Sequence, residues 1–291
     1  DDAIALYAAV AEKRPEAFLQ ISRAFIKTNR FNKAQAPLMR YIAARPQSDE
    51  GYYLLGYVLF RQGRPKDSLL VYEQAQLLKP AAADDLKIIG LDYGLLKDYE
   101  RSAQFLEKSL AANAEDLEAH YYLGRVRFEQ GRFEEARSSF EEVLRRDPAH
   151  AKAQNNLGQV YEAQNDQPRA MTAYRLAIDL DRRSGRPSEL PFLNLGTLLG
   201  ENGQVEEALD LLVRAAEINP ASVKVKLQLG KSYAKLGRLA EAEREMVAAT
   251  RLAPSDAGAR YILGQLYRRQ GKTQLAREQL QLSESLRDGK K

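Results

Sequence analysis

Apolar side chains recur along this chain at helical spacing, in pairs of short segments joined by a turn that in most pairs contains a glycine or asparagine. The clearest pair is a first segment over residues 117–130 and a second over 133–146. Apolar side chains of the second segment fall on one helical stripe: Ala136, Phe140 and Val143. Gly131 tolerates the left-handed conformation that ends a helix, and Pro148 marks the next turn. The pattern predicts two helices joined by a tight turn.

The same pair of segments recurs with a period of 34 residues. One small residue marks each first segment: Ser22, Gly56, Gly90, Gly124, Gly158, Gly196, Gly230 and Gly264. A second small residue follows twelve positions later: Ala34, Ser68, Ser102, Ala136, Ala170, Ala208, Ala242 and Ala276. Two small residues let paired helices approach closely, and a large residue four positions further fills the space beside them. A fixed period of this length indicates stacked units instead of one globular core.

These features resemble the tetratricopeptide repeat family. The chain shares its period, its pattern of small and large residues and its closing proline, here Pro46, Pro80, Pro148, Pro220 and Pro254. The resemblance covers essentially the whole chain and implies an all-α fold, a right-handed superhelical α-solenoid of antiparallel helix pairs. Two departures are mild: Lys97 stands where other units have glycine or asparagine at the turn, and Arg127 replaces the usual tyrosine.

The period divides the chain into eight units. They are residues 15–48, 49–82, 83–116, 117–150, 151–188, 189–222, 223–256 and 257–291. The fifth unit holds four additional residues near Arg182–Glu189, and we expect them to lengthen a loop, because loops tolerate insertion. A basic contact loop or a change in superhelical pitch is the alternative. Residues 1–14 are interpreted as a lone second helix of a truncated preceding unit, so we expect the natural protein to extend upstream of Asp1.

The resemblance also implies where a partner binds. In this family the first helices line the concave side of the array, and their residues that are not used for stacking face a groove. In units two to four these positions are mostly aromatic or apolar: Tyr53, Leu54, Tyr57, Phe60, Ile88, Leu91, Leu95, Tyr121, Tyr122, Arg125 and Phe128. Large exposed apolar patches mark interaction sites, so an apolar partner segment is one interpretation. Tight packing across a narrow superhelix is the other.

In units five to eight the groove positions become polar. They include Asn155, Asn156, Gln159, Asn194, Lys224, Gln228, Lys231 and Arg268. Asn156 and Asn194 resemble the asparagine ladder with which some repeats of this family hold a peptide backbone. A carboxamide suits that role because it both donates and accepts hydrogen bonds. A solvated groove wall is the alternative, and the cationic residues favour an acidic partner segment near the C-terminal half.

Charge and composition narrow the function classes. A net charge of +4, from 44 basic and 40 acidic residues, argues against a uniform nucleic-acid-binding surface, and we expect no nucleic-acid partner. No segment approaches about 18 consecutive apolar residues, so we expect no membrane span. The chain has no cysteine, which excludes disulfides and fits the cytoplasm and the periplasm equally.

Catalytic chemistry has no candidate residues in the sequence. The two histidines, His120 and His150, stand at a packing position and a turn, without a ligand set at metal spacing. We therefore expect no enzyme activity, no cofactor and no metal. The prediction is a non-catalytic scaffold that binds a protein or peptide segment in its groove. The alternatives are a substrate-recruiting region of a larger enzyme and a structural subunit of a multiprotein assembly, and the sequence does not fix the oligomeric state.

Overall fold

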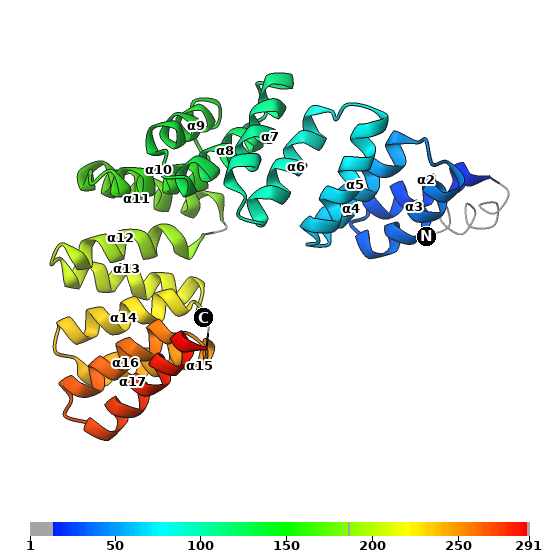
Figure 1. Ribbon diagram of the computed structural model, residues 1–291. Coiled ribbons are helices and arrows are strands. Elements are labelled where there is room, and N and C mark those ends of the chain that lie inside the picture. Colours follow the sequence, from blue (N-terminus) through cyan, green and yellow to red (C-terminus); the bar gives the residue numbers. More distant parts are fainter. Residues whose placement is uncertain (1–13, 186, 290–291) are drawn as a thin grey trace. The chain divides into compact units, whose positions relative to one another are not determined.

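The computed structural model describes residues 14–185 and 187–289, which form sixteen α-helices and no strands. The first helices of the pairs are α2 (Pro15–Lys27), α4 (Asp49–Arg61), α6 (Ala83–Leu95), α8 (Leu117–Glu129), α10 (Ala151–Ala163), α12 (Glu189–Glu201), α14 (Val223–Lys235) and α16 (Ala257–Arg269). The second helices are α3 (Phe31–Ala44), α5 (Pro65–Leu78), α7 (Tyr99–Ala112), α9 (Phe133–Arg146), α11 (Gln167–Ser184), α13 (Val205–Ile218), α15 (Leu239–Leu252) and α17 (Thr273–Asp288). Each first helix packs against the second helix that follows it (Figure 1), which confirms the all-α solenoid of helix pairs.

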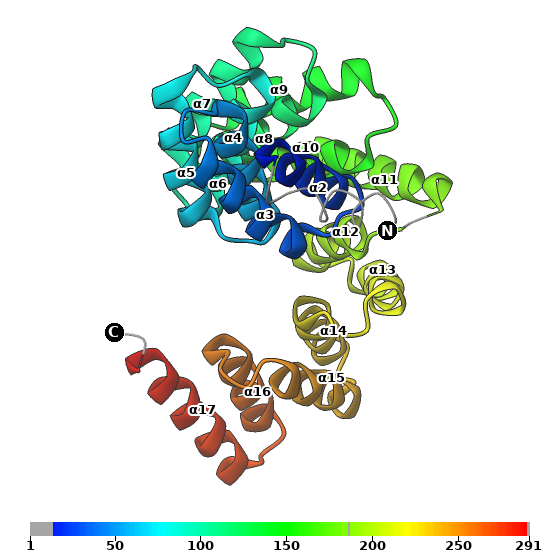
Figure 2. The ribbon, with the colours of Figure 1, turned by 90° about the vertical axis from the view of Figure 1, so that its right-hand side faces the viewer.

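The helices fall into two compact units along the chain. The first unit ends at Arg146 and holds α2 to α9, and the second begins at Asp147 and holds α10 to α17. Within each unit, a second helix also packs on the first helix of the next pair, so the pairs stack in chain order. Figure 2 shows this succession for α14 to α17. The lone helix predicted within residues 1–14 falls on a segment outside the described residues and stays a prediction.

The recurring glycine of the first helix is explained by the large residue that packs over it. A Cβ added to Gly158 would lie 2.5 Å from the ring of Tyr174, and one added to Gly124 would lie 2.7 Å from the ring of Phe140. Both rings are buried, with at most 1% of their surface exposed, so they cannot move aside. The period of small residues is therefore a requirement of helix packing.

Two second helices carry serine at their small position, and the hydroxyl then bonds the preceding first helix. Ser68 Oγ donates to the carbonyl oxygen of Gly56 at 2.9 Å. Ser102 Oγ donates to the carbonyl oxygen of Gly90 at 2.6 Å. These hydrogen bonds satisfy buried hydroxyl groups, so serine is accommodated as well as alanine.

The turns inside the pairs adopt a left-handed backbone. The residues with positive φ at these turns are Asn29, Gly63, Lys97, Gly131, Asn165, Gly203, Gly237 and Gly271. Lys97 has a φ of 61° although its side chain disfavours this region. The geometry of the pair therefore overrides the local preference, at a cost of about 1–2 kcal/mol.

The four additional residues of the fifth unit lie in a helix, so the predicted longer loop is wrong. Helix α11 has 18 residues, whereas α9 and α13 have 14 each. Four residues make about one helical turn, so the insertion leaves the buried stripe in register. The added turn is tied to the next helix, because the backbone N–H of Ser188 donates to Oδ2 of the buried Asp181 at 3.1 Å. Gly185, with a φ of 69°, then ends the helix.

Arg127 replaces an apolar side chain with a network of ion pairs. Its side chain is largely buried, and its Nε lies 3.0 Å from Glu135 Oε2 on α9. The guanidinium also pairs with Glu107 on α7 and donates to Gln130 Oε1 at 3.1 Å. Arg127 therefore links α7, α8 and α9 at the place where other units pack a tyrosine, a phenylalanine or a leucine.

Candidate functional site

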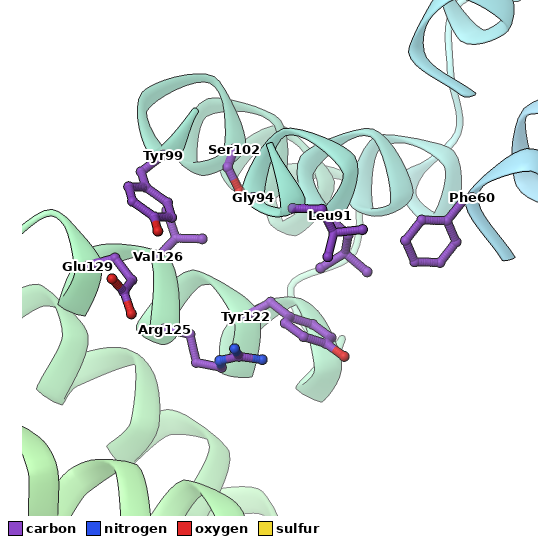
Figure 3. Close-up of a pocket in the computed structure, with 10 residues that line it drawn as sticks. Phe60, Leu91, Gly94, Tyr99, Ser102, Tyr122, Arg125, Val126 and Glu129 are labelled. Atoms are coloured by element: carbon purple, nitrogen blue, oxygen red, sulfur yellow. The ribbon is translucent and has the colours of Figure 1, made fainter. Parts of the chain in front are cut away.

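A pocket of about 290 Å³ opens in the first unit between α4, α6, α7 and α8. It is termed the aromatic pocket, and its lining residues are Phe60, Leu91, Gly94, Leu95, Tyr99, Ser102, Tyr122, Arg125, Val126 and Glu129. Figure 3 shows Tyr122 and Arg125 of α8 on one side of the pocket, Leu91 of α6 on the other side and Phe60 of α4 at one end. The predicted groove residues Phe60, Leu91, Tyr122 and Arg125 therefore lie around one opening.

Gly94, which has no side chain, is one of the residues that line the aromatic pocket. Gly94 lies four residues after Gly90, and the same place holds Phe60 in the preceding repeat and Phe128 in the following one. A Cβ added to Gly94 would meet Ser102 Oγ at 3.2 Å. The prediction of the groove missed Gly94, although comparing the repeats position by position reveals the missing aromatic side chain.

The aromatic pocket has apolar walls and a charged rim. Leu95 is 60% exposed although it is apolar, while Leu91 and Tyr122 are half-buried. At the rim, Arg125 Cζ lies 5.7 Å from the centre of the Tyr122 ring, and Glu129 is exposed. Burial raises the pKa of Tyr122, so its phenol is neutral and able to donate a hydrogen bond. Such a site suits an apolar side chain whose flanking polar groups meet the rim.

Three other predicted tyrosines contact neighbouring helices outside this pocket. Tyr53 donates from its hydroxyl to the carbonyl oxygen of Lys79 at 2.6 Å. Tyr57 meets the ring of Phe31 edge-on, with 6.0 Å between centroids. The ring centroid of Tyr121 lies 6.1 Å from that of Phe140, the large residue of the same pair. These tyrosines contribute to helix stacking.

The remaining apolar candidates also pack within the helix stack. Leu54 packs against the buried cluster around Leu38, and Ile88 packs against the cluster around Tyr72. The ring of Phe128 lies 5.6 Å from that of Phe133, across the turn of the fourth pair. The predicted apolar groove thus divides into the aromatic pocket and a set of side chains that join the helices.

A second pocket, of about 220 Å³, lies in the second unit between α10, α12 and α14. It is termed the amide pocket and is lined by Glu162, Leu193, Asn194, Thr197, Lys224, Leu227, Gln228 and Lys231. Lys224 and Lys231 are exposed and lie two turns apart on one face of α14. Neither lysine has an ion-pair partner within the described residues. The pocket therefore combines amide groups with free positive charge.

The predicted asparagines are hydrogen bonded to one another beside the amide pocket. Asn194 Nδ2 donates to Asn155 Oδ1 at 3.0 Å, and Asn155 Nδ2 donates to Asn156 Oδ1 at 3.4 Å. Asn155 is only 5% exposed, so it supports Asn194 from within the stack. Glu162 is likewise engaged, because its Oε2 accepts from the Tyr174 hydroxyl at 2.6 Å.

Two predicted polar residues lie away from the residues that line the amide pocket. Gln159 is half-buried on α10. Arg268 is exposed at a more open hollow of about 440 Å³ beside α17, with Thr273, Arg277 and Glu284. The polar half of the predicted groove is therefore not one continuous site within the second unit.

The histidines have structural contacts. His150 caps α10, because its Nδ1 accepts from the backbone N–H of Ala153 at 3.0 Å, and His120 Nε2 lies 3.0 Å from the carbonyl oxygen of Ala114. Within residues 14–185 and 187–289, no group of three or more His, Cys, Asp or Glu is placed to hold a metal ion. Over the same ranges, every helix is too short or too polar to span a membrane.

Comparison with solved structures supports the fold. A tetratricopeptide repeat protein from Parabacteroides merdae superposes with a TM-score of 0.68 at 16% identity, over 92% of this chain and 98% of that chain. The APC/C hetero-tetramer Cut9–Hcn1 contains a chain with a TM-score of 0.68 at 16% identity, over 97% of this chain and 55% of that chain. At this identity the similarity concerns the fold alone.

Comparison with curated proteins and family models identifies the family. Anaphase-promoting complex subunit 3 of Schizosaccharomyces pombe is 24% identical over 192 residues, 66% of this chain and 28% of that protein. The matched segments span 18% to 33% of the length of the curated relatives. A family model described as tetratricopeptide repeat matches residues 19–85, 123–187, 193–245 and 227–286, and a second one with the same description matches 95–139. With eight helix pairs in its described residues and a 34-residue period, the chain belongs to the tetratricopeptide repeat family.

Proposed function

We propose that this chain is a non-catalytic scaffold that binds a segment of a partner protein on its first helices, with an apolar side chain of that segment in the aromatic pocket. The observation that carries the proposal is the opening at Gly94, a position at which the neighbouring repeats have Phe60 and Phe128. Its volume of about 290 Å³ is at the lower end for small-molecule sites and suits a single large side chain.

The rim of the aromatic pocket supports a polypeptide ligand. Arg125 and Glu129 are exposed with opposite charges one turn apart on α8. The Tyr99 and Tyr122 side chains provide apolar area with hydroxyl groups able to bond a peptide backbone. An apolar anchor surrounded by such polar contacts is the usual arrangement of a binding hot spot.

We further propose that the amide pocket binds an acidic segment. Lys224 and Lys231 supply two unpaired cations, and Gln228 supplies an amide between them on α14. Positive charge at an exposed rim attracts acidic residues and raises the association rate more than it raises affinity. The amide pocket is a separate site in the second unit, and its proposal does not depend on the aromatic pocket.

The aromatic pocket is tested by two matched substitutions of exposed leucines. Leu95 lines the pocket and is 60% exposed, whereas Leu77 lies on the second helix α5 and is 79% exposed. Leu95→Lys and Leu77→Lys both place a charge in a solvated position, so both should leave stability nearly unchanged. Partners captured from a lysate and identified by mass spectrometry should be lost with Leu95→Lys and retained with Leu77→Lys. Identical partner sets for both variants and the unmodified protein would reject the pocket as the binding site.

A structural subunit of a multiprotein assembly is the second candidate. It is favoured by the similarity to a subunit of the anaphase-promoting complex. The two candidates differ in what suffices for binding. A synthetic peptide from the captured partner should displace that partner if the aromatic pocket is the site, and should fail to do so if binding needs an extended surface.

A further inference from the structure

Two positions of each first helix face into the helix stack, and in α6 both carry a carboxyl group. They lie five residues before and two residues after the recurring small residue. In the other repeats the first position holds Ala17, Gly51, Ala119, Ala153, Pro191, Val225 or Ala259, all of them buried. The second position holds Ala24, Val58, Val126, Val160, Leu198, Ser232 or Leu266. In the third repeat these two positions are Asp85 and Asp92.

Asp92 is fully buried, and no cation among the residues that the structure describes acts on it. Its side chain is 0% exposed, and neither carboxyl oxygen has a hydrogen-bond partner among the described residues. The polar group that acts on it is the hydroxyl of Ser68 on α5, whose proton is already donated to Gly56. An ionised carboxylate here would lack both solvent and a compensating charge. As a neutral acid, Asp92 can instead offer its own proton to Ser68 Oγ.

Asp85 and Asp92 lie on the same face of α6. They are seven residues apart, with Ile89 between them on the same stripe. Ile89 is buried in a cluster with Leu69 and Tyr72 of α5, so this face meets the second repeat. Seven residues span roughly 10 Å along a helix, which is too far for both carboxyls to hold a single cation.

The groups that face this stripe from α4 and α5 are tyrosines. From α5 comes Tyr72, whose buried hydroxyl has no partner among the described residues. From α4 come Tyr57 and Tyr53. Burial first, and then the negative charge of Asp85, raise the pKa of Tyr72 and raise that of Tyr53 to about 12. A phenol is never a cation, so none of these tyrosines can supply the positive charge that would balance a carboxylate.

The polar groups on α7 and α8 that face α6 are already paired. On α7, Ser102 donates to Gly90 of α6. The N-cap residue of α8, Asp116, accepts from Lys87 of α6 at 2.8 Å. Lys87 is therefore paired with Asp116. Among the described residues, the charged group that acts on Asp85 is the neighbouring carboxylate Asp84, which is of the same sign, and a backbone hydrogen bond at Ala82 acts in the opposite direction.

These surroundings favour the protonated carboxyls in the folded state. Burial raises the pKa of Asp92 to about 7 and that of Asp85 to about 6, whereas an unfolded aspartate titrates near 4. At a pH between the pKa of the unfolded state and that of the folded state, the native state binds protons that the unfolded state does not. Stability is therefore greatest below about pH 4 for these groups and falls as pH rises, until each carboxyl has ionised in the native state.

We propose that the contact between the second and third repeats is a pH-sensitive joint, closely packed when Asp85 and Asp92 are protonated and loosened when they ionise. The joint lies inside the first unit, where α5 meets α6. The aromatic pocket takes Phe60 from the second repeat and Leu91 from the third, so loosening the joint also disturbs that pocket. This last consequence rests on the proposed function, whereas the joint itself does not.

Direct titration of the carboxyl groups needs no partner and no destabilised variant. In the whole chain with ¹³C-labelled aspartate, the Asp92 carboxyl resonance should titrate near pH 7 and that of Asp85 near pH 6. The exposed Asp210 on α13 provides a reference carboxyl resonance in the same sample. Ordinary midpoints near pH 4 for both Asp85 and Asp92 would overturn the proposal.

Unfolding by urea at several pH values tests the link to stability. The equilibrium constant for unfolding should rise with pH between about 5 and 7, by up to tenfold per pH unit for Asp92. Asp92→Val introduces the residue that the neighbouring repeats have at this position, Val58 and Val126, and should remove the pH dependence that Asp92 contributes. Glu73→Gln, at an exposed site on α5, should leave that pH dependence unchanged. The same slope in all three proteins would contradict a role for Asp92.

Spin labels locate the change at the joint, because the chain has no cysteine that would compete with introduced ones. A pair at the exposed positions Leu77 and Lys108 spans the joint from α5 to α7. A pair at Lys108 and Glu141 spans the next contact, which lacks the two carboxyls. Raising the pH from 5 to about 8 should broaden the first distance distribution and leave the second unchanged. Equal behaviour of both pairs would refute a joint between the second and third repeats.

Discussion

Filling the aromatic pocket should strengthen the fold while it weakens binding. Glycine inside a helix is about 0.5–1 kcal/mol less favourable than alanine. Gly94→Leu removes this cost and places an apolar side chain where neighbouring repeats have Phe60 and Phe128. The new Cβ would lie 3.2 Å from Ser102 Oγ, so that side chain must shift by a few tenths of an ångström. We expect the free energy of unfolding to rise by about 0.5–1 kcal/mol.

Binding should change in the opposite direction. A buried apolar anchor contributes about 2 kcal/mol or more, so excluding it should weaken the affinity by about 30-fold. Fluorescence anisotropy with a labelled peptide from the captured partner measures this affinity, and urea denaturation followed by circular dichroism measures the stability.

Gly90→Ala is the matched control, one turn earlier on the same helix. A Cβ there would lie 2.9 Å from Leu106 Cγ and 3.1 Å from the carbonyl oxygen of Ser102, and this backbone atom cannot easily yield. We expect Gly90→Ala to lower the free energy of unfolding by about 1–3 kcal/mol, because it overpacks a buried contact. A Gly94→Leu protein that binds the peptide normally, or that is destabilised like Gly90→Ala, would show that position 94 does not open onto a binding pocket.

Three further predictions concern other sites. Lys97→Gly should raise the free energy of unfolding by about 0.5–1 kcal/mol, because Lys97 has a φ of 61°, and an unchanged urea midpoint would count against this strain. Arg127→Ala should lower the free energy of unfolding by about 2–3 kcal/mol, because the guanidinium joins three helices. Arg127→Tyr should lower it less in the same urea assay, because tyrosine restores the family's usual packing. Lys224→Ala combined with Lys231→Ala should slow association of an acidic peptide and flatten its salt dependence in stopped-flow measurements. Equal slowing of a neutral peptide would contradict the charge argument.

The fold could be predicted because one physical constraint repeats along the chain. Each helix pair needs a small residue under a large one, and the repeated register fixes where the helices begin, as at Asp49 for α4 and Leu117 for α8. The four additional residues in the fifth unit could not be placed in this way. Four residues fit either a loop or one more helical turn. The hydrogen bond from Ser188 to Asp181, which ties the longer helix to α12, is a tertiary contact that the repeat pattern does not show.

The candidate site was only partly predictable, because neighbouring residues on a helix face different surroundings. Tyr121 and Tyr122 are adjacent in sequence, yet Tyr121 packs on Phe140 while Tyr122 lines the aromatic pocket. A rotation of about 100° per residue separates them, and the sequence alone does not give the rotation of the helix in the stack. Gly94 escaped prediction for another reason, since an opening is created by a side chain that is missing.

Photo-crosslinking tests most directly the claim that a partner segment binds on the first helices. A photoreactive side chain in place of Arg125 stands at the rim of the aromatic pocket, and one in place of Lys108 stands exposed on the second helix α7. We predict that the Arg125 position crosslinks one defined segment of the captured partner, identified by mass spectrometry, while the Lys108 position does not. Crosslinks from Lys108 with none from Arg125 would contradict this prediction.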